Sequence, residues 1–113
     1  MTTLWHYTCD HGAELIRRDG LVKAHPQPVL DQVTLSWWTD LGPEHRYEVG
    51  LTSDLLTCDR MAHRFQAKDP STLERWTRAA RNWRIPPVVR DELEDGRLPA
   101  HWWVAFDPVE VVT

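Results

Sequence analysis

The sequence predicts one α+β domain over residues 1–113, with a mixed, partly antiparallel split sheet and flanking helices. The chain has 113 residues, which is the length of a single domain. Hydrophobic residues make up 42% and charged residues 27%, as in ordinary globular proteins. Short apolar and aromatic segments interleave with amphipathic ones, without the regular βαβα order of a parallel sheet.

The chain begins with a strand, a helix and a loop. Aromatic residues that favour strands predict a strand over 3–8. A helix is expected over 10–19, with Asp10 as its N-cap and Gly20 ending it. Two prolines predict a loop over 21–32.

Three strands, separated by a loop and a turn, are expected in the middle of the chain. The apolar segment at 33–39 predicts a strand, and the polar segment at 40–48 predicts a loop. A short strand over 49–52 and a turn or helical stub over 53–59 follow. Imperfect alternation of apolar and charged residues predicts a further strand over 60–67.

The strongest helix pattern lies at 71–84. Ser71 and Glu74 have the spacing of a capping box at a helix start. Large apolar side chains and one alanine then recur at helical spacing, at Leu73, Trp76, Ala80 and Trp83. Two prolines end the segment and open a second helix, which is expected from Pro87 to Gly96.

The last predicted element is a strand over 101–112, bent or at a sheet edge because of Pro108.

No segment approaches the roughly 18 apolar residues that a membrane span needs, and no signal peptide pattern opens the chain. We therefore expect a cytoplasmic protein with reduced thiols and without a membrane partner. The histidines lack the spacing of a metal site, so no metal is expected.

Several polar residues are candidates for ligand binding. His6 and Thr8 could donate to a ligand at a strand end, or His6 could simply bond to the backbone of its own fold. Asp40, Glu48 and Glu110 are carboxylate candidates among which the spacing selects none.

Arginines occur in two groups. Arg60 and Arg64 could clamp a pyrophosphate, or pair with nearby carboxylates. The second group recurs every three residues on the predicted 71–84 helix and forms either a solvated face or a phosphate contact, at Arg75, Arg78, Arg81 and Arg84. The net charge of −4 argues against a nucleic acid partner.

An ordered set of short segments resembles small ADP-ribosyltransferase-like proteins. The opening LWHYT, followed by a helix that ends in Gly-Leu, is similar to the H-Y-T start of that family. The later segments SWWTDL, GLTS, CDR with HRF, and PAHWWVAFDPVEVV are similar to a group of small uncharacterised actinobacterial and phage proteins.

The resemblance implies an NAD-binding cleft in a split sheet. In such enzymes a strand histidine holds a ribose, which implies His6 here, with Tyr7 and Thr8 beside it. An aromatic or hydroxyl residue of the second strand borders nicotinamide, which implies Trp38 and Thr39. A late-strand glutamate stabilises the positive charge that develops as nicotinamide leaves.

The chain departs from the family pattern at that last residue. Its late-strand glutamate, Glu110, has no Q-x-E or E-x-E around it, and the chain is short for a full transferase. Both departures weaken the expectation of catalysis more than the expectation of the fold or of nucleotide binding.

Two functions from different classes are therefore expected. The leading hypothesis is an NAD-binding mono-ADP-ribosyltransferase with a protein acceptor, in which Glu110 and His6 serve catalysis and Arg60 or Arg64 meets the pyrophosphate. The alternative is a non-catalytic, phage-encoded interaction module that docks on a host protein through exposed tryptophans and the arginines of the 71–84 segment. An RNA-binding domain ranks last, and it would show itself by a steep salt dependence of binding.

Overall fold

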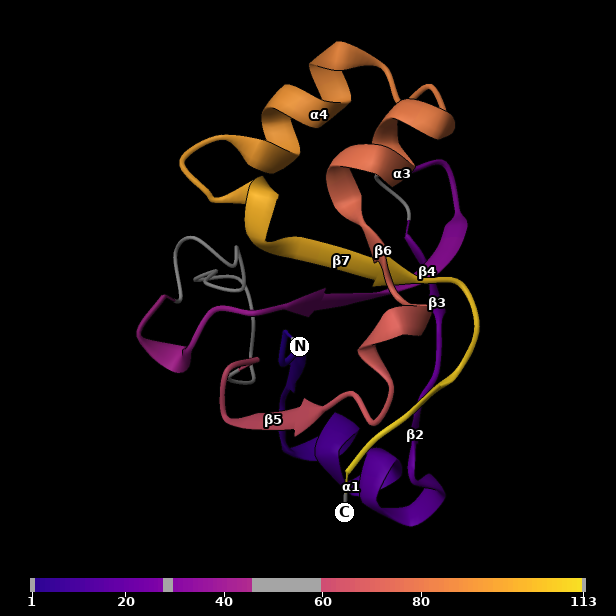
Figure 1. Ribbon diagram of the computed structural model, residues 1–113, viewed down its shortest axis with the longest axis vertical. Helices are drawn as coiled ribbons and strands as arrows, with labels where there is room; N and C mark the ends of the chain where they lie inside the picture. Colours follow the sequence, from indigo (N-terminus) through magenta and orange to yellow (C-terminus); the bar gives the residue numbers. More distant parts are fainter. Residues whose placement is uncertain (1, 28–29, 46–59, 113) are drawn as a thin grey trace.

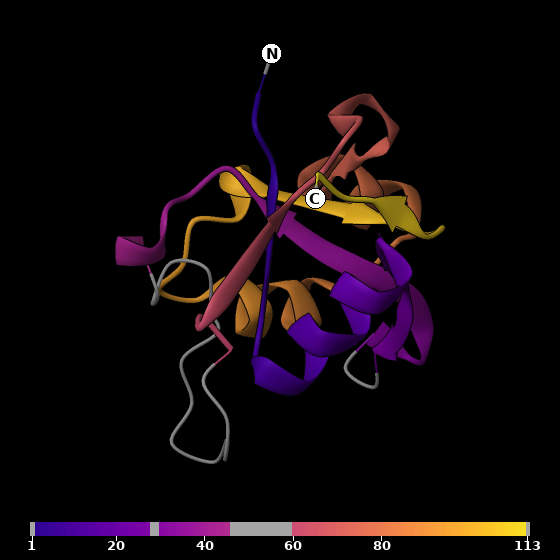
Figure 2. The same cartoon turned by 90° about the horizontal axis from the view of Figure 1, so that it is seen from below.

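A six-stranded antiparallel sheet forms the centre of the fold (Figure 1). The computed structural model of the chain describes residues 2–27, 30–45 and 60–112. The sheet has the order β5-β1-β4-β7-β6, and β3 pairs with β4 off this path. In that order the strands are His63–Gln66, Trp5–Thr8, Val33–Thr39, Trp102–Ala105 and Glu74–Arg75, with β3 at His25–Gln27. β4 and β7 lie side by side through the middle of the molecule, and β5 crosses β4 steeply because the sheet twists (Figure 2).

A second, two-stranded sheet joins the early and late parts of the chain. β2, Leu21–Val22, pairs antiparallel with β8, Val109–Glu110. An isolated bridge between Ala67 and Val111 links this small sheet to the end of β5. The C-terminal segment therefore lies close to α1, as Figure 1 shows.

Helix α1, Asp10–Asp19, packs on one face of the main sheet. Its buried Ile16 belongs to the same apolar cluster as Leu4, Trp38 and Trp103. The helix ends at Gly20, which has a φ of 70° and donates its N–H to the carbonyl oxygen of Ile16 at 2.7 Å. Glycine adopts this left-handed conformation without a Cβ penalty, so it stops the helix there.

Helices α3, Trp76–Asn82, and α4, Pro87–Glu94, lie at the opposite end of the molecule from α1 (Figure 1). Trp76 is fully buried and shares a second apolar cluster with Trp102 and Val104 of β7. Successive residues of a strand point to opposite faces, so β7 contributes Trp103 to the first cluster and Trp102 to the second. The two clusters thus form the core on the two faces of the sheet.

The structure confirms the α+β class, and all pairings among the described strands are antiparallel. The predicted helix over 10–19 and the predicted strand over 33–39 have the predicted bounds. The prediction of Asp10 as N-cap is wrong, because Cys9 occupies that position and Asp10 is the first helical residue. The predicted loop over 21–32 contains β2 and β3, since both short segments find pairing partners far along the chain or in β4.

The predicted helix over 71–84 begins later than its capping box indicates. Residues Pro70–Thr72 form a 3-10 turn, in which Asp69, not Ser71, accepts the capping N–H bond at 3.1 Å. Glu74 and Arg75 then pair with β7 as strand β6, so the helix starts only at Trp76. Sheet pairing has overridden a local helix signal here.

The C-terminal segment is two strands instead of one. β7 ends at Ala105, and the chain resumes at β8 after Pro108, in a different sheet. The predicted strand over 60–67 is shorter, at His63–Gln66. The predicted elements over 49–52 and 53–59 lie outside the described residues. Across the described ranges, none of the helices combines the length and apolar character needed to cross a membrane.

Candidate functional site

His6 lies in the middle of β1 and is held by the neighbouring strand. Its Nδ1 nitrogen is 2.8 Å from the backbone carbonyl oxygen of Trp37. A carbonyl oxygen only accepts, so Nδ1 carries the proton and Nε2 carries the lone pair. Burial lowers the pKa of His6 below its ordinary value of 6.5, which keeps the ring neutral. His6 is therefore a fixed, neutral imidazole with Nε2 as an acceptor.

Trp38 of β4 stands beside His6. The ring centroids are 5.4 Å apart, and the planes are tilted by 48°. Trp38 is only 2% exposed, and its indole N–H donates to the hydroxyl of Ser36 at 2.8 Å. The structure thus brings together two residues that the resemblance assigned to one ligand, although 31 residues separate them in the sequence.

Tyr7 and Thr39 lie on the opposite face of the sheet from His6 and Trp38, because strand residues alternate. The Tyr7 hydroxyl donates to the carbonyl oxygen of Leu41 at 2.7 Å, and burial raises the pKa of this phenol. The Thr39 hydroxyl donates to the carbonyl oxygen of His101 at 2.7 Å and accepts the N–H of Leu41 at 3.1 Å. Both hydroxyls therefore hold loop backbone in place.

Arg64 shares that opposite face, since it pairs with Tyr7 across β1 and β5. Its guanidinium carbon lies 3.9 Å from the centroid of the half-buried Trp5 ring, in a cation–π contact. Arg60 is exposed in the turn that precedes β5. The two arginines assigned to a pyrophosphate clamp are thus placed differently relative to the sheet, and the structure does not pair them.

Thr8 ends β1 on the same face as His6 and packs against α1. A Cβ atom added at Gly12 would lie 2.0 Å from the Thr8 hydroxyl oxygen. Gly12 therefore leaves room for the Thr8 side chain at the start of the helix.

Glu110 belongs to the small sheet, where it pairs with Leu21. Its carboxylate is 3.7 Å from the ammonium of Lys68, and both side chains are largely exposed. These two residues line a surface hollow of about 590 Å³ together with Asp69, Thr72 and residues 105–109. His6 and Trp38 are not part of the lining, so the carboxylate assigned to catalysis and the histidine assigned to ribose lie in different parts of the fold.

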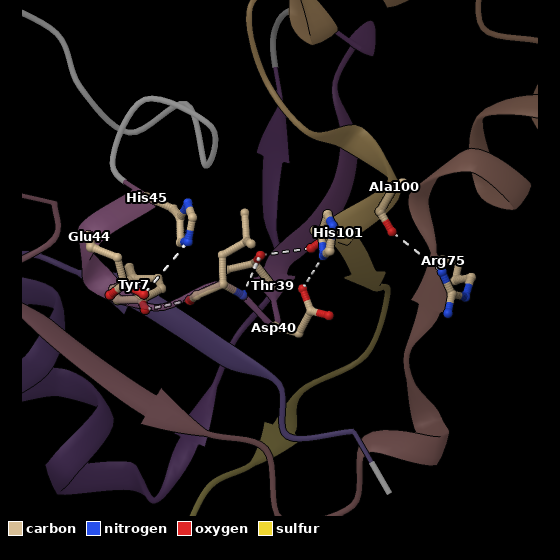
Figure 3. A network of polar contacts seen from close by, with 9 residues as sticks. Tyr7, Thr39, Asp40, Glu44, His45, Arg75, Ala100 and His101 are labelled. Carbon is tan, nitrogen blue, oxygen red and sulfur yellow. Dashed lines mark hydrogen bonds and ion pairs between the residues drawn. The ribbon is translucent and has the colours of Figure 1, made fainter.

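A histidine–carboxylate pair that the sequence did not reveal lies where β4 ends and β7 begins. Nδ1 of His101 is 2.8 Å from an Asp40 carboxylate oxygen, and the two side chains point toward each other (Figure 3). The residues are 61 positions apart, so only the strand register brings them together. Asp40 was a candidate carboxylate in the sequence, but no local signal linked it to His101.

The tryptophans predicted as exposed docking residues are not exposed. Trp38, Trp76, Trp102 and Trp103 are buried, and the other three are half-buried.

The predicted series of arginines on one helix is interrupted. Arg75 lies on β6 with its guanidinium over the Trp103 ring, and Arg84 lies beyond the end of α3 with a φ of 54°. The predicted slanting stripe on one helix is wrong, because only Arg78 and Arg81 lie on α3.

Comparisons with protein-family models, curated proteins and solved structures find no match for this chain. Among the described residues, no group of three histidine, cysteine or carboxylate side chains is arranged to hold a metal ion. The geometry of the site is a fixed neutral imidazole beside an indole ring on one sheet face, and an Asp40–His101 pair where β4 ends and β7 begins.

Proposed function

We propose that the chain binds NAD at the His6 and Trp38 face of the sheet and transfers ADP-ribose to an acceptor. The observation that carries the proposal is the contact between His6 and Trp38. The family resemblance nominated them from separate strands, and their rings lie 5.4 Å apart. NAD is a substrate in this reaction, because its ribose–nicotinamide bond is broken.

The chemistry of the pair suits a nucleoside. The Nε2 atom of a neutral imidazole can accept a hydrogen bond from a ribose hydroxyl, and Nδ1 is already bound to Trp37. The indole of Trp38 packs beside this ring in the core, 2% exposed, and is kept in its rotamer by Ser36, so it supports the position of His6. Thr8 on the same face supplies a further hydroxyl.

The proposal leaves several residues in structural roles. Tyr7, Thr39 and Arg64 lie on the other sheet face, where they bond to loop backbone or stack on Trp5. Glu110 pairs with Lys68. Arg60, exposed in its turn, stays the candidate for the pyrophosphate.

The test is calorimetric titration of the folded chain with NAD. We expect saturable binding that His6→Ala weakens about tenfold or more, which corresponds to roughly 1.4 kcal/mol for a lost hydrogen bond. His11→Ala is the matched control, because His11 is exposed on α1. Circular dichroism of both variants establishes that they are folded.

Two results would overturn the proposal. One is the absence of NAD binding by the wild-type chain at millimolar concentration. The other is unchanged binding by a folded His6→Ala variant. The first result would favour the interaction-module hypothesis, for which capture of a protein partner is the next experiment. The second would show that NAD binds elsewhere on the chain and that the His6 assignment is wrong.

A further inference from the structure

We propose that Asp40 and His101 form the proton-accepting pair of the transfer reaction, with His101 as general base for a hydroxyl acceptor or water. This inference rests on the proposed function, since it assigns a role within the same reaction. It starts from the 2.8 Å contact between Nδ1 of His101 and a carboxylate oxygen of Asp40.

The contact fixes which ring nitrogen is available. A carboxylate accepts, so Nδ1 of His101 carries the donated proton, and in the neutral ring the lone pair is on Nε2. The His101 side chain is 42% exposed and that of Asp40 is 29% exposed, so a substrate can reach the imidazole. The carboxylate also stabilises the imidazolium that forms when Nε2 takes a proton, as in hydrolytic triads.

The backbone around the pair is held from both strands. The Thr39 hydroxyl bridges the carbonyl oxygen of His101 and the N–H of Leu41, at 2.7 and 3.1 Å (Figure 3). The Tyr7 hydroxyl binds the Leu41 carbonyl oxygen at 2.7 Å. Support of this kind limits the movement of the two side chains, which general-base catalysis requires.

Strand register places the pair at a useful distance from His6. Thr39 lies opposite Trp5 on one side and opposite Trp102 on the other. Asp40 directly follows the end of β4, and His101 is the last residue of the 3-10 turn Pro99–His101 that directly precedes β7. Two strand spacings and two residues of rise separate the Cα atoms of His6 and His101 by about 12 Å.

The reaction step balances without a further reagent. The acceptor O–H gives its proton to Nε2 of His101, and the oxygen lone pair forms a bond to the anomeric carbon of the nicotinamide ribose. The bond from that carbon to the nicotinamide nitrogen breaks, and its electron pair leaves with neutral nicotinamide. The imidazolium, stabilised by Asp40, then returns the proton to water.

The experiment measures nicotinamide release from NAD together with NAD binding, using the full chain. We expect His101→Gly to bind NAD as the wild type does and to release nicotinamide about 100-fold more slowly, the usual contribution of a general base. Free imidazole should restore part of the rate, because it fills the space of the missing ring. Asp40→Asn should lower kcat about tenfold or more with KM little changed, since Asp40 positions and stabilises the base. His11→Ala serves as the exposed control.

The outcomes separate this inference from the proposed function. Binding and turnover that His101→Gly leaves unchanged would overturn the base assignment alone. A slow His101→Gly variant that imidazole does not rescue would also overturn it, because the loss would then be structural. NAD binding without any nicotinamide release by the wild type would overturn the inference and leave nucleotide binding standing. Absence of NAD binding would overturn both.

Discussion

The imidazole of His6 and the backbone carbonyl of Trp37 are joined across two neighbouring strands, with Nδ1 and the oxygen 2.8 Å apart. The bond occupies Nδ1 and fixes the tautomer, so β4 leaves Nε2 as the ring nitrogen that can accept from a ligand. The same burial that makes this bond strong makes a charged ring costly. A structural bond and a candidate binding function thus share one side chain.

The first prediction concerns pH. His6 should titrate below its ordinary value of 6.5, because burial disfavours the imidazolium. The unfolded chain then binds more protons than the folded chain, so the stability that His6 contributes is complete above about pH 6.5 and is lost as pH falls through the lowered folded pKa. NMR titration of the His6 ring measures the value directly. A His6→Gln variant should lose less stability than the wild type between about pH 7.5 and pH 5 in urea unfolding. A His6 midpoint at or above 6.5 would show that burial does not disfavour the charged ring.

Thr39→Val should destabilise the fold by roughly 1–3 kcal/mol. Thr39 is 2% exposed, and the change would leave the Leu41 N–H and the His101 carbonyl without their hydroxyl partner. Thr34→Val on the same strand is the control, because Thr34 is exposed and valine suits a strand. We expect that control to remain within about 0.5 kcal/mol of the wild type. Equal midpoints of urea unfolding for the two variants would show that the bridge contributes nothing.

Trp76→Phe should cost more stability than Trp83→Phe. Trp76 is fully buried, contacts Trp37 and Trp102, and donates its indole N–H to Glu94 at 2.9 Å. Phenylalanine would leave a cavity and remove that donor, at a cost of about 1–3 kcal/mol. Trp83 is half-buried against Phe106, so the same change there removes less packing. Thermal unfolding of the two variants gives the comparison. A larger loss of stability for Trp83→Phe than for Trp76→Phe would contradict the central position of Trp76 in the core.

Local signals predicted those elements whose stability is decided locally. The helix at 10–19 follows from its buried Ala13 and Ile16 and from Gly20, and the structure has it with those bounds. The strand at 33–39 is central and continuous in its apolar character, so any pairing partner leaves it a strand. The α+β class follows from such elements.

Long-range pairing decided the elements that the sequence did not predict. Leu21–Val22 is a strand because β8, almost 90 residues later, provides its partner. Glu74 and Arg75 leave the predicted helix because β7 offers hydrogen bonds to them. The Asp40–His101 pair has the same origin, since its two residues meet only through the register of β4 and β7. Histidines and carboxylates carry no periodic pattern, so a pair formed across strands leaves no trace in either segment.

Gly12 and Thr8 should be energetically coupled. Alanine normally stabilises a helix interior by about 1 kcal/mol over glycine. At Gly12, however, the new Cβ would lie 2.0 Å from the Thr8 hydroxyl oxygen, so Gly12→Ala should destabilise the chain or gain nothing. In a Thr8→Ala background the hydroxyl is gone, and Gly12→Ala should then stabilise. Urea unfolding of the wild type, the two single variants and the double variant gives the coupling as a double-mutant cycle. Additive effects would mean that α1 does not press against the end of β1, and the NAD-binding proposal would lose the fixed position of Thr8 beside His6.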